Sequence, residues 1–426
     1  MTELALFGGP KTIAQPFAKY NSIGREEIEA GKAVLESGQL SGFYGSWDEK
    51  FFGGDKVREF EKDWTKFFGV KHAVTVNSNT SGLIAAVGAI GIEPGDEVIV
   101  SPWTMSASAT AIVIWNAIPV FADIEDETFN LDPASIERNI TPRTRAIMVT
   151  DIFGHAADMD VIMAIASKHK LKVIEDCAQA PAARYRGRYA GTIADIGVYS
   201  LNYHKHIHTG EGGVCVTNDA TLAERLQLIR NHAEAVVAGK GVDDISNMIG
   251  FNFRMTEIEA AIGIEQLKKL NILTAARTNQ ADRLDAGLAN LRGLRTSIVK
   301  PGCSHVYYVY PLVYDDTQTG VPREQVVKAL RAEGVPASMG YLNLHLLPMY
   351  QRRVAHGRNG FPWSAPFYHG TVSYAKGICP VAEDLHDRRY IGMSMCLFDY
   401  TAQDIDLLIS AFRKVWSNFD RLRQAH

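Results

Sequence analysis

At 426 residues the chain is longer than one ordinary domain of ~100–200 residues, so we expect two domains. A formal charge of −4, with 22% charged residues, supplies no basic excess for holding nucleic acid or an anionic membrane surface. The 5 cysteines are odd in number and form no CxxC pair. This argues against a disulfide framework or a thiolate zinc site and favours buried reduced thiols in a cytoplasmic protein.

The N-terminus and the most apolar stretch both argue against membrane targeting. Residues 1–10 (MTELALFGGP) lack basic residues and a sustained apolar run, unlike a signal peptide. Residues 107–122 are the most apolar stretch, but Thr110, Asn116 and Pro119 interrupt them, and they fall short of the ~20 residues that a membrane span needs. We interpret this stretch as a buried helix entering a buried strand, and expect a cytoplasmic protein with no membrane partner.

Short apolar strands alternate with helical patterns from about residue 70 to residue 220. Strands are expected at residues 73–76, 97–100, 118–121, 146–150, 171–174, 197–200 and 213–217, with helices from Ser81 and over residues 106–115. Many of these strands are continuous Val/Ile runs, which suits a sheet covered on both faces. The pattern predicts an α/β fold with a mostly parallel sheet.

Longer helical patterns follow. Residues 254–273 have apolar positions at helical spacing, with Thr256 and Glu257 near the start, and a second long helix is expected over about 273–291. Beyond residue 302 we expect a strand at 307–313, a helix at 322–333, a strand near 337–341 and a terminal helix at 402–423. These elements predict a large domain of residues 1–275, including the N-terminal segment, and a smaller α+β domain of residues 276–426.

Two polar stretches come where strands of the first domain should end, and ligands gather at the carboxyl ends of strands in open α/β sheets. Residues 77–82 (NSNTSG) offer the hydroxyls of Thr80 and Ser81 at a helix N-terminus, where a phosphate is favoured; an ordinary N-cap is the alternative. Asp176, at the end of VIED, could hold a proton on a heteroaromatic nitrogen of a cofactor. Its alternatives are a helix cap or a pair with Arg184 or Arg186.

A third stretch, residues 200–213 (SLNYHKHIHTGEGG), places three histidines around Lys205. A neutral lysine amine can form a Schiff base, and burial or nearby positive charge lowers its pKa. A metal site formed by His204, His206 and His208 is less favoured because no carboxylate cluster accompanies them. A basic surface loop is the third possibility.

The fourth stretch, residues 249–257 (IGFNFRMTE), opens the long helix. A structural loop is its default interpretation. Asn252 and Arg254, between aromatic residues, could instead reach a neighbouring site.

In this order, and over most of the chain, the stretches resemble the DegT/DnrJ/EryC1/StrS family of sugar aminotransferases, which have the aspartate-aminotransferase fold and use pyridoxal 5′-phosphate. The resemblance implies a seven-stranded sheet between helices in the cofactor domain. It implies that Lys205 forms the Schiff base and that Asp176 pairs with the pyridinium nitrogen. It places the other cofactor-binding residues at Thr80, Ser81, Met105, Gln179, Ser200 and Asn252. Asn252 would extend across a homodimer interface to the partner's cofactor phosphate.

Some positions depart from the family pattern. Where the family commonly stacks an aromatic residue on the cofactor ring, this chain has Met105, and Trp103 lies two residues earlier. A thioether can also pack on a ring. Asn79 replaces a usual glycine in the phosphate loop, and Asp151 replaces a common histidine, which changes the electrostatics expected near the substrate.

The resemblance implies transfer of an amino group from glutamate or glutamine to a small keto sugar or keto-cyclitol. Alternatives are a sugar dehydratase of the same fold, in which histidine replaces the lysine, and a non-catalytic member that acts as a regulator. Residues 42–54 and 352–363 lengthen the chain, and this length together with the N-terminal ALFGGP resembles the branch that aminates cyclitols. Surface insertions are the alternative interpretation of both segments.

Overall fold

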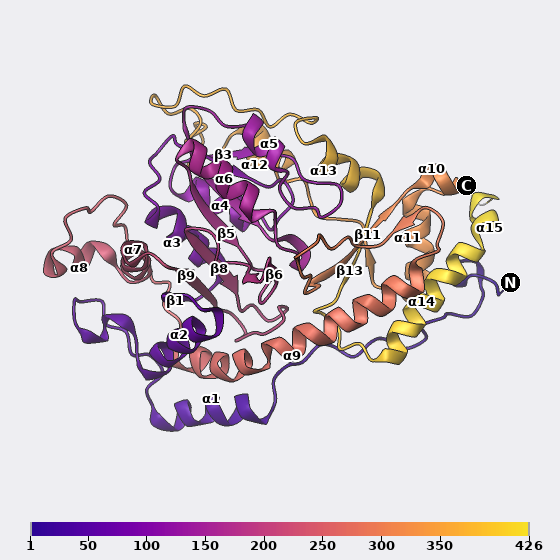
Figure 1. The fold of residues 1–426 in the computed structure, drawn as a ribbon, viewed down its shortest axis with the longest axis horizontal. Coiled ribbons are helices and arrows are strands. Elements are labelled where there is room, and N and C mark those ends of the chain that lie inside the picture. The colour runs from indigo at the N-terminus through magenta and orange to yellow at the C-terminus, as the bar shows by residue number, and fades with distance from the viewer. Residues whose placement is uncertain (1, 425–426) are drawn as a thin grey trace.

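The computed structural model describes residues 2–424, which contain a seven-stranded sheet surrounded by helices (Figure 1). The strand order is β1-β9-β8-β5-β4-β2-β3. β9 is antiparallel to both of its neighbours, and the other pairs are parallel. The strands are β1 (His72–Val76), β2 (Glu97–Val100), β3 (Ile118–Phe121), β4 (Thr144–Thr150), β5 (Lys172–Asp176), β8 (Ile196–Ser200) and β9 (Gly213–Thr217). The predicted α/β class with a mostly parallel sheet is confirmed.

Helices cover both faces of this sheet, which explains its continuous apolar strands. Successive strand residues point to opposite faces: Val98 and Val100 join the core beneath α3 and α4, whereas Ile99 joins the core on the α2 and α6 side. The helices up to residue 288 are α1 (Arg25–Ser37), α2 (Asp55–Phe68), α3 (Asn79–Ala89), α4 (Ala107–Ile114), α5 (Pro133–Arg138), α6 (Met159–His169), α7 (Ala220–Arg230), α8 (Ala233–Lys240) and α9 (Glu257–Leu288).

A second, antiparallel sheet lies in the C-terminal part, in the order β10-β11-β13-β12. Its strands are β10 (Leu294–Arg295), β11 (Val309–Tyr314), β12 (Ala337–Ser338) and β13 (Tyr390–Ser394); β6 (Arg184–Tyr185) and β7 (Arg188–Tyr189) form a separate hairpin. The remaining helices are α10 (Asp316–Thr319), α11 (Arg323–Ala332), α12 (Pro348–Arg352), α13 (Pro380–Asp384), α14 (Ala402–Ser417) and α15 (Phe419–Gln424).

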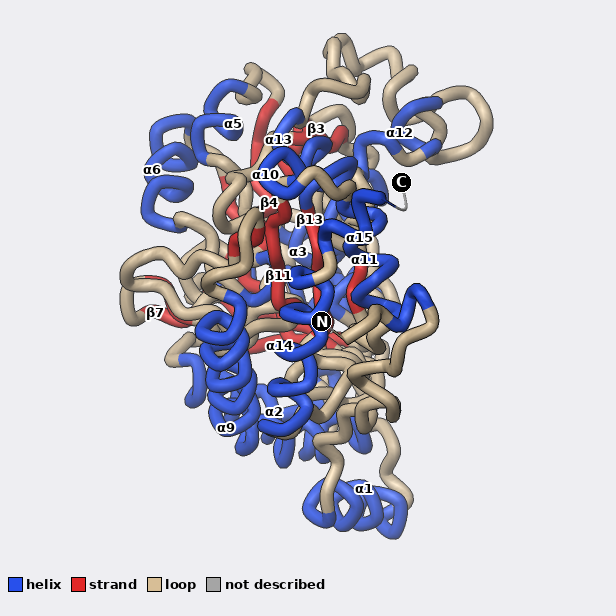
Figure 2. Tube along the Cα trace, turned by 90° about the vertical axis from the view of Figure 1, so that its right-hand side faces the viewer, coloured by secondary structure: helices blue, strands red, loops and turns tan. Residues whose placement is uncertain are grey.

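The long helix α9 links the two sheets. It is one continuous helix of 32 residues, whereas the sequence predicted two helices meeting near residue 273. Thr256 and Glu259 form a capping box at its start, and no proline interrupts it. α1 packs along α9 and lies at the outer edge of the molecule in both views (Figures 1 and 2). The proposed domain division at residue 275 falls within α9 and stays a prediction.

Segments near the N-terminus and in the C-terminal part pack into cores formed by elements distant in the sequence. Leu4 and Ile13 pack with β11, α11 and α14, so both termini lie at the same end of the molecule (Figure 1). In the other direction, Trp363 and Tyr374 return to the core of the large sheet, where the Tyr374 hydroxyl donates to the Pro119 carbonyl at 2.8 Å. Residues far apart in the sequence therefore share each core.

Besides α9, two elements of the C-terminal part differ from their sequence prediction, and a third was not predicted. The terminal helix is divided into α14 and α15 at Asn418, whose side-chain amide donates to the Lys414 carbonyl at 2.8 Å. The strand near 337–341 pairs only over Ala337–Ser338, because the chain turns away at Gly340, where φ is 139°. β13 was not predicted, since it carries Gly392, a residue depleted in strands. Among residues 2–424, no helix combines the length and apolar character that crossing a membrane requires.

Candidate active site

The carboxyl ends of β1, β5 and β8 meet around one cavity of about 190 Å³. This is where ligands gather in open α/β sheets. Most of the predicted site residues line it: Thr80, Met105, Asp176, Gln179, Ser200 and Lys205. Ser81 and Asn252 do not. The cavity therefore brings together side chains that are more than a hundred positions apart in the sequence.

Asp176 is 3% exposed and is fixed by three donors. Ser108 Oγ donates to Asp176 Oδ2 at 2.7 Å, while Asn79 Nδ2 and the Ala178 amide reach Oδ1 at 3.3 and 3.2 Å. Burial raises the pKa of Asp176, and the bond from Ser108 opposes that shift. A carboxylate held in this way has one orientation and can share a proton with a ring nitrogen placed in the cavity.

The alternative pairing of Asp176 with an arginine does not occur. The Arg184 side chain donates to the Gly187 carbonyl at 2.8 Å and lies over the Tyr189 ring. Arg186 pairs with Asp160 at 2.7 Å. Both guanidinium groups therefore belong to the β6–β7 hairpin and its neighbours.

Lys205 is 7% exposed, and its amine faces the cavity without a hydrogen bond or ion pair to any residue between 2 and 424. Burial lowers the pKa of this amine to about 8, against the opposing attraction of Asp176. A useful fraction of the amine is therefore neutral near pH 7, as a nucleophilic lysine requires. The buried position also excludes the basic-surface-loop interpretation.

The three histidines around Lys205 face separate surroundings. His206 is fully buried, and its Nε2 lies 2.8 Å from the Val306 carbonyl oxygen. His204 lines the cavity, and burial lowers its pKa to about 4. His208 Nδ1 accepts from the Gly210 amide at 3.3 Å. Because their contacts diverge, these rings do not form a common set of metal ligands.

The glycines after the histidines bring β9 against the loop before α3. A Cβ at Gly213 would lie 2.7 Å from the Ser78 carbonyl carbon and 2.8 Å from the Asn79 amide nitrogen. Real Cβ atoms do not come so close to backbone. Gly213 therefore allows the close approach of two chain segments at the rim of the cavity.

The start of α3 both caps the helix and faces the cavity. Ser78 is the N-cap, and its Oγ accepts from the Ser81 amide at 3.1 Å and lies 3.0 Å from Ser81 Oγ. The Ser81 side chain thus contacts the capping Ser78 and does not line the cavity, whereas Ser78, Asn79 and Thr80 do. Helix N-termini favour phosphate through unpaired N–H groups and the helix dipole. The sequence prediction missed Ser78, although capping residues at a strand–helix junction are a signal for it.

The structure distinguishes Trp103 from Met105. Trp103 is fully buried, donates through Nε1 to Asn343 Oδ1 at 2.8 Å, and stacks on Phe129. Met105 is 65% exposed and lines the cavity. Met105 is therefore the residue of this pair that can cover a cofactor ring.

Two tyrosines from the C-terminal part reach the site and were not predicted. Gln179 Nε2 donates to the Tyr341 hydroxyl at 2.9 Å, and Gln179 Oε1 accepts from the Phe153 amide at 2.8 Å. The Lys205 amine lies 4.0 Å from the centre of the Tyr308 ring. The sequence assigned neither tyrosine a role, and their contacts with Gln179 and Lys205 come from the tertiary structure.

Asn252 lies outside the cavity of its own chain. Its side chain is exposed, and its Oδ1 accepts from Arg254 Nε at 2.8 Å. Neither of the two segments that lengthen the chain lines the cavity either. Residues 42–54 pack near Asn231, which donates to the Tyr44 carbonyl at 2.8 Å, and Trp363 is buried beside the large sheet.

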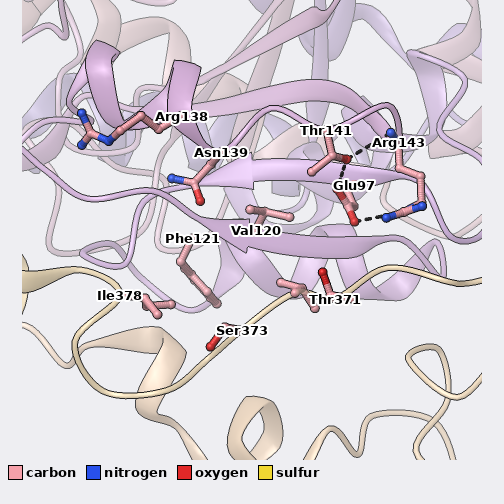
Figure 3. A pocket seen from close by; sticks show the side chains of 11 residues that line it. Glu97, Val120, Phe121, Arg138, Asn139, Thr141, Arg143, Thr371, Ser373 and Ile378 are labelled. Atoms are coloured by element: carbon pink, nitrogen blue, oxygen red, sulfur yellow. Dashed lines mark hydrogen bonds and ion pairs between the residues drawn. The ribbon is translucent and has the colours of Figure 1, made fainter.

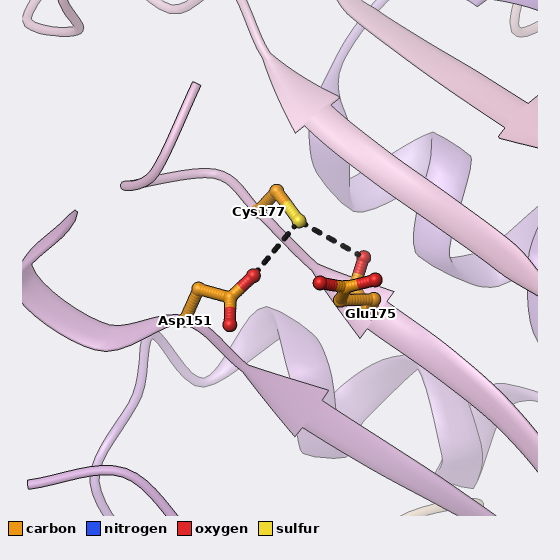
Figure 4. A group of neighbouring side chains, drawn as sticks. All are labelled: Asp151, Glu175 and Cys177. Carbon is orange, nitrogen blue, oxygen red and sulfur yellow. Dashed lines mark hydrogen bonds between the residues drawn. The ribbon is translucent and has the colours of Figure 1, made fainter. Parts of the chain in front are cut away.

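Asp151 lies on the opposite side of β4 and β5 from the cavity. Its Oδ1 accepts from the Ala157 amide at 2.8 Å, and Cys177 Sγ donates to its Oδ2 at 3.0 Å (Figure 4). Glu175 is beside it, and all three side chains are buried. Thr150, Asp176 and Ala178, which alternate with these residues, line the cavity. Asp151 therefore does not line the cavity, and its effect on the electrostatics near the substrate stays a prediction.

A second cavity, of about 280 Å³, lies beside the edge strand β3 and contains none of the predicted site residues (Figure 3). Its buried carboxylate, Glu97, is already paired with Arg143 Nε at 3.2 Å. The Tyr368 hydroxyl also donates to Glu97 at 3.0 Å. We therefore place the chemistry in the cavity that holds Lys205.

The donor set of the Lys205 cavity fits pyridoxal 5′-phosphate. Asp176 suits the ring nitrogen, the amine of Lys205 suits the aldehyde, and the N-terminus of α3 with Ser200 suits the phosphate. The fit rests on chemistry that no other described cavity combines: a buried carboxylate, a lysine amine and hydroxyls at a helix N-terminus.

Several known proteins are similar to this chain. A model of the DegT/DnrJ/EryC1/StrS aminotransferase family matches residues 22–387. The L-glutamine:2-deoxy-scyllo-inosose aminotransferase of Streptoalloteichus tenebrarius is 34% identical over 435 residues, covering 99% of this chain and 99% of that protein. The GDP-perosamine synthase of Caulobacter vibrioides is 40% identical over 305 residues, covering 70% and 79%. The structure of an aminotransferase from Psychrobacter cryohalolentis has a TM-score of 0.79 at 29% identity, covering 95% and 100%.

Proposed function

Because the chain belongs to the DegT/DnrJ/EryC1/StrS aminotransferase family, we propose that it moves an amino group from L-glutamine or L-glutamate to the ketone of a keto sugar or keto-cyclitol, with Lys205 as its reactive amine. It is an aminotransferase that uses pyridoxal 5′-phosphate. One observation carries the assignment of residues: the amine of Lys205 and the carboxylate of Asp176 are buried in the same cavity.

The bound cofactor supplies an electron-withdrawing ring and an aldehyde that exchanges amines. Asp176 would keep the ring nitrogen protonated, and Ser108 fixes the orientation of that carboxylate. Lys205 Nζ would take the proton from the substrate carbon and pass it on, so that its own protonation state is restored in each half of the reaction. Thr80 and Ser200 would hold the phosphate, and Met105 would cover the ring.

We place keto-cyclitols ahead of nucleotide-linked keto sugars. The cyclitol aminotransferase of Streptoalloteichus tenebrarius aligns over 99% of this chain, whereas the GDP-perosamine synthase aligns over 70%. Within residues 2–424, Lys205 is the one lysine or arginine that lines the cavity, which gives little attraction for a pyrophosphate. A nucleotide-linked sugar stays the second candidate.

An acceptor panel tests the substrate. Glutamine and glutamate are offered separately, each with keto-cyclitols and with nucleotide-linked keto sugars, and the aminated product is measured by mass spectrometry. Amination of a free cyclitol ketone supports the first choice. Turnover of nucleotide-linked sugars alone would reject it and leave the aminotransferase assignment intact.

Borohydride reduction followed by peptide mass mapping tests the site. The reduced cofactor should be found on Lys205 and be absent in Lys205→Ala. An adduct on another lysine would reject the assignment of Lys205. An active enzyme that forms no lysine adduct would favour the dehydratase alternative, and a chain that never binds the cofactor would favour the regulatory one.

We further propose a cytoplasmic homodimer in which Asn252 reaches the cofactor phosphate of the partner subunit. Its exposed side chain outside its own cavity supports this arrangement. Mixing inactive Lys205→Ala subunits with inactive Asn252→Asp subunits should restore activity, because one of the two composite sites then carries both native residues. Failure of the mixed dimer to recover activity would remove the shared-site assignment.

A further inference from the structure

The aromatic ring of Tyr308 is the close neighbour of the Lys205 amine. Nζ lies 4.0 Å from the ring centre, well within the distance of a cation–π contact. Lys205 follows β8 in the first half of the chain, and Tyr308 immediately precedes β11. The contact therefore joins the large sheet to the C-terminal one.

The backbone of Tyr308 is held from both sides. Its amide donates to the Phe153 carbonyl at 2.8 Å, and its own carbonyl accepts from the Met395 amide at 3.1 Å. Burial raises the pKa of the Tyr308 hydroxyl, so the ring carries a neutral phenol. Tyr308 therefore acts on the Lys205 amine through the face of its ring, which the backbone hydrogen bonds hold in place.

No other charged side chain in the described part of the chain competes with the Tyr308 ring for contact with the Lys205 amine. Asp176 attracts the Lys205 amine, but no ion pair joins these two side chains within residues 2–424. Burial lowers the pKa values of His204 and His206 and raises that of the Cys396 thiol, so these side chains are uncharged near pH 7. A cation in this position is stabilised by the electron-rich ring.

We propose that Tyr308 is a positioning residue that receives the Lys205 ammonium whenever the lysine is not bonded to the cofactor. Amino transfer frees this lysine in the middle of each cycle, and its long flexible side chain then needs a defined resting place. The Tyr308 face supplies one that keeps the amine in the cavity while it carries the proton. This inference rests on Lys205 being the reactive lysine of the proposed function.

Competitive labelling measures the effect directly. The full-length enzyme is prepared with pyridoxamine 5′-phosphate bound, so that Lys205 is free, and the pH midpoint of its labelling by an amine-reactive reagent is read by peptide mass mapping. Tyr308→Phe keeps the ring and should keep the wild-type midpoint. Tyr308→Leu removes the ring and should lower the midpoint by roughly 0.4–1.5 pH units.

A second substitution removes any dependence on folding of the leucine variant. Pentafluorophenylalanine at position 308 keeps the shape of phenylalanine and reverses the charge distribution of the ring face. Its midpoint should fall below that of Tyr308→Phe. If these two midpoints agree, the electrostatics of the ring are not the cause and the proposal is overturned.

The two hypotheses fail in different ways. A reduced-cofactor adduct on a lysine other than Lys205 would overturn the proposed site, and Tyr308 with it. An adduct on Lys205, together with equal midpoints for the Leu, Phe and wild-type enzymes, would overturn the role of Tyr308 alone.

Discussion

Asp151 and Glu175 place two carboxyl groups in the interior beneath the sheet, where both cannot ionise without cost. Burial raises the pKa of Asp151 from 3.8 to about 6, and the pKa of Glu175 is raised well above 4.5 by burial and by Asp151. The folded chain thus holds the Asp151 proton more tightly than the unfolded chain. The stability from this group is fully present below pH 3.8 and is lost as the pH rises to about 6.

The size of this loss follows from the shift. About 2 pKa units at 1.36 kcal/mol each correspond to about 3 kcal/mol of unfolding free energy. Asp151→Asn removes the ionisation, and its side-chain oxygen can still accept from the Ala157 amide. Between pH 3 and pH 7 the wild type should therefore lose about 3 kcal/mol relative to this variant.

Equilibrium unfolding in urea at a series of pH values, with equal cofactor saturation, measures the difference. Two variants at Cys177 provide matched controls, because its thiol donates to Asp151 Oδ2 and lowers the pKa of that carboxyl. Cys177→Ala should enlarge the loss, and Cys177→Ser, which keeps a donor, should not. Parallel curves for the wild type and Asp151→Asn would refute the reasoning.

Three further substitutions test the site. Ser108→Ala removes the hydrogen bond that opposes the rise in the pKa of Asp176, so this pKa should rise further. The acid limb of the kcat/KM profile should then move to higher pH, and an unmoved limb would contradict this. Asn252→Ala should weaken cofactor retention in dialysis without abolishing folding, and unchanged cofactor affinity would exclude a phosphate contact. Gly213→Ala should displace the loop before α3 and destabilise by about 1–3 kcal/mol, with weaker cofactor binding. The control is Gly31→Ala in helix α1, where an added Cβ meets no atom within 4 Å, and it should stabilise by about 0.5–1 kcal/mol. If both variants change the melting temperature by the same amount and in the same direction, the argument from close packing at Gly213 is contradicted.

Local sequence patterns predicted the framework of the large sheet because they report burial and backbone preference. The Val/Ile runs at β2, β4 and β5 are buried on both faces, and the expected strands fall within a few residues of those observed. The same patterns could not predict that α9 continues past residue 273, since no residue there marks an end. They also missed β13, which pairs between two partners supplied by other parts of the chain.

The motifs placed Asp176 and Lys205 at strand ends, and alternation along β5 explains why Asp176 faces the cavity while Glu175 and Cys177 face the opposite core. Sequence spacing could not choose between Met105 and Trp103. The two residues are two positions apart, yet Trp103 is buried and Met105 is exposed. That choice depends on Asn343, which binds the Trp103 indole from the C-terminal part.

The amino-acid sequence by itself determined the α/β class, the order of the motifs and the residue types at the site. Only the tertiary structure decided what surrounds the Lys205 amine: the three histidines contact different partners, and Tyr308 comes from the segment just before β11 in the C-terminal part. The physical reason is that periodicity describes one element at a time, whereas the environment of a buried charge is set by side chains from every element packed around it.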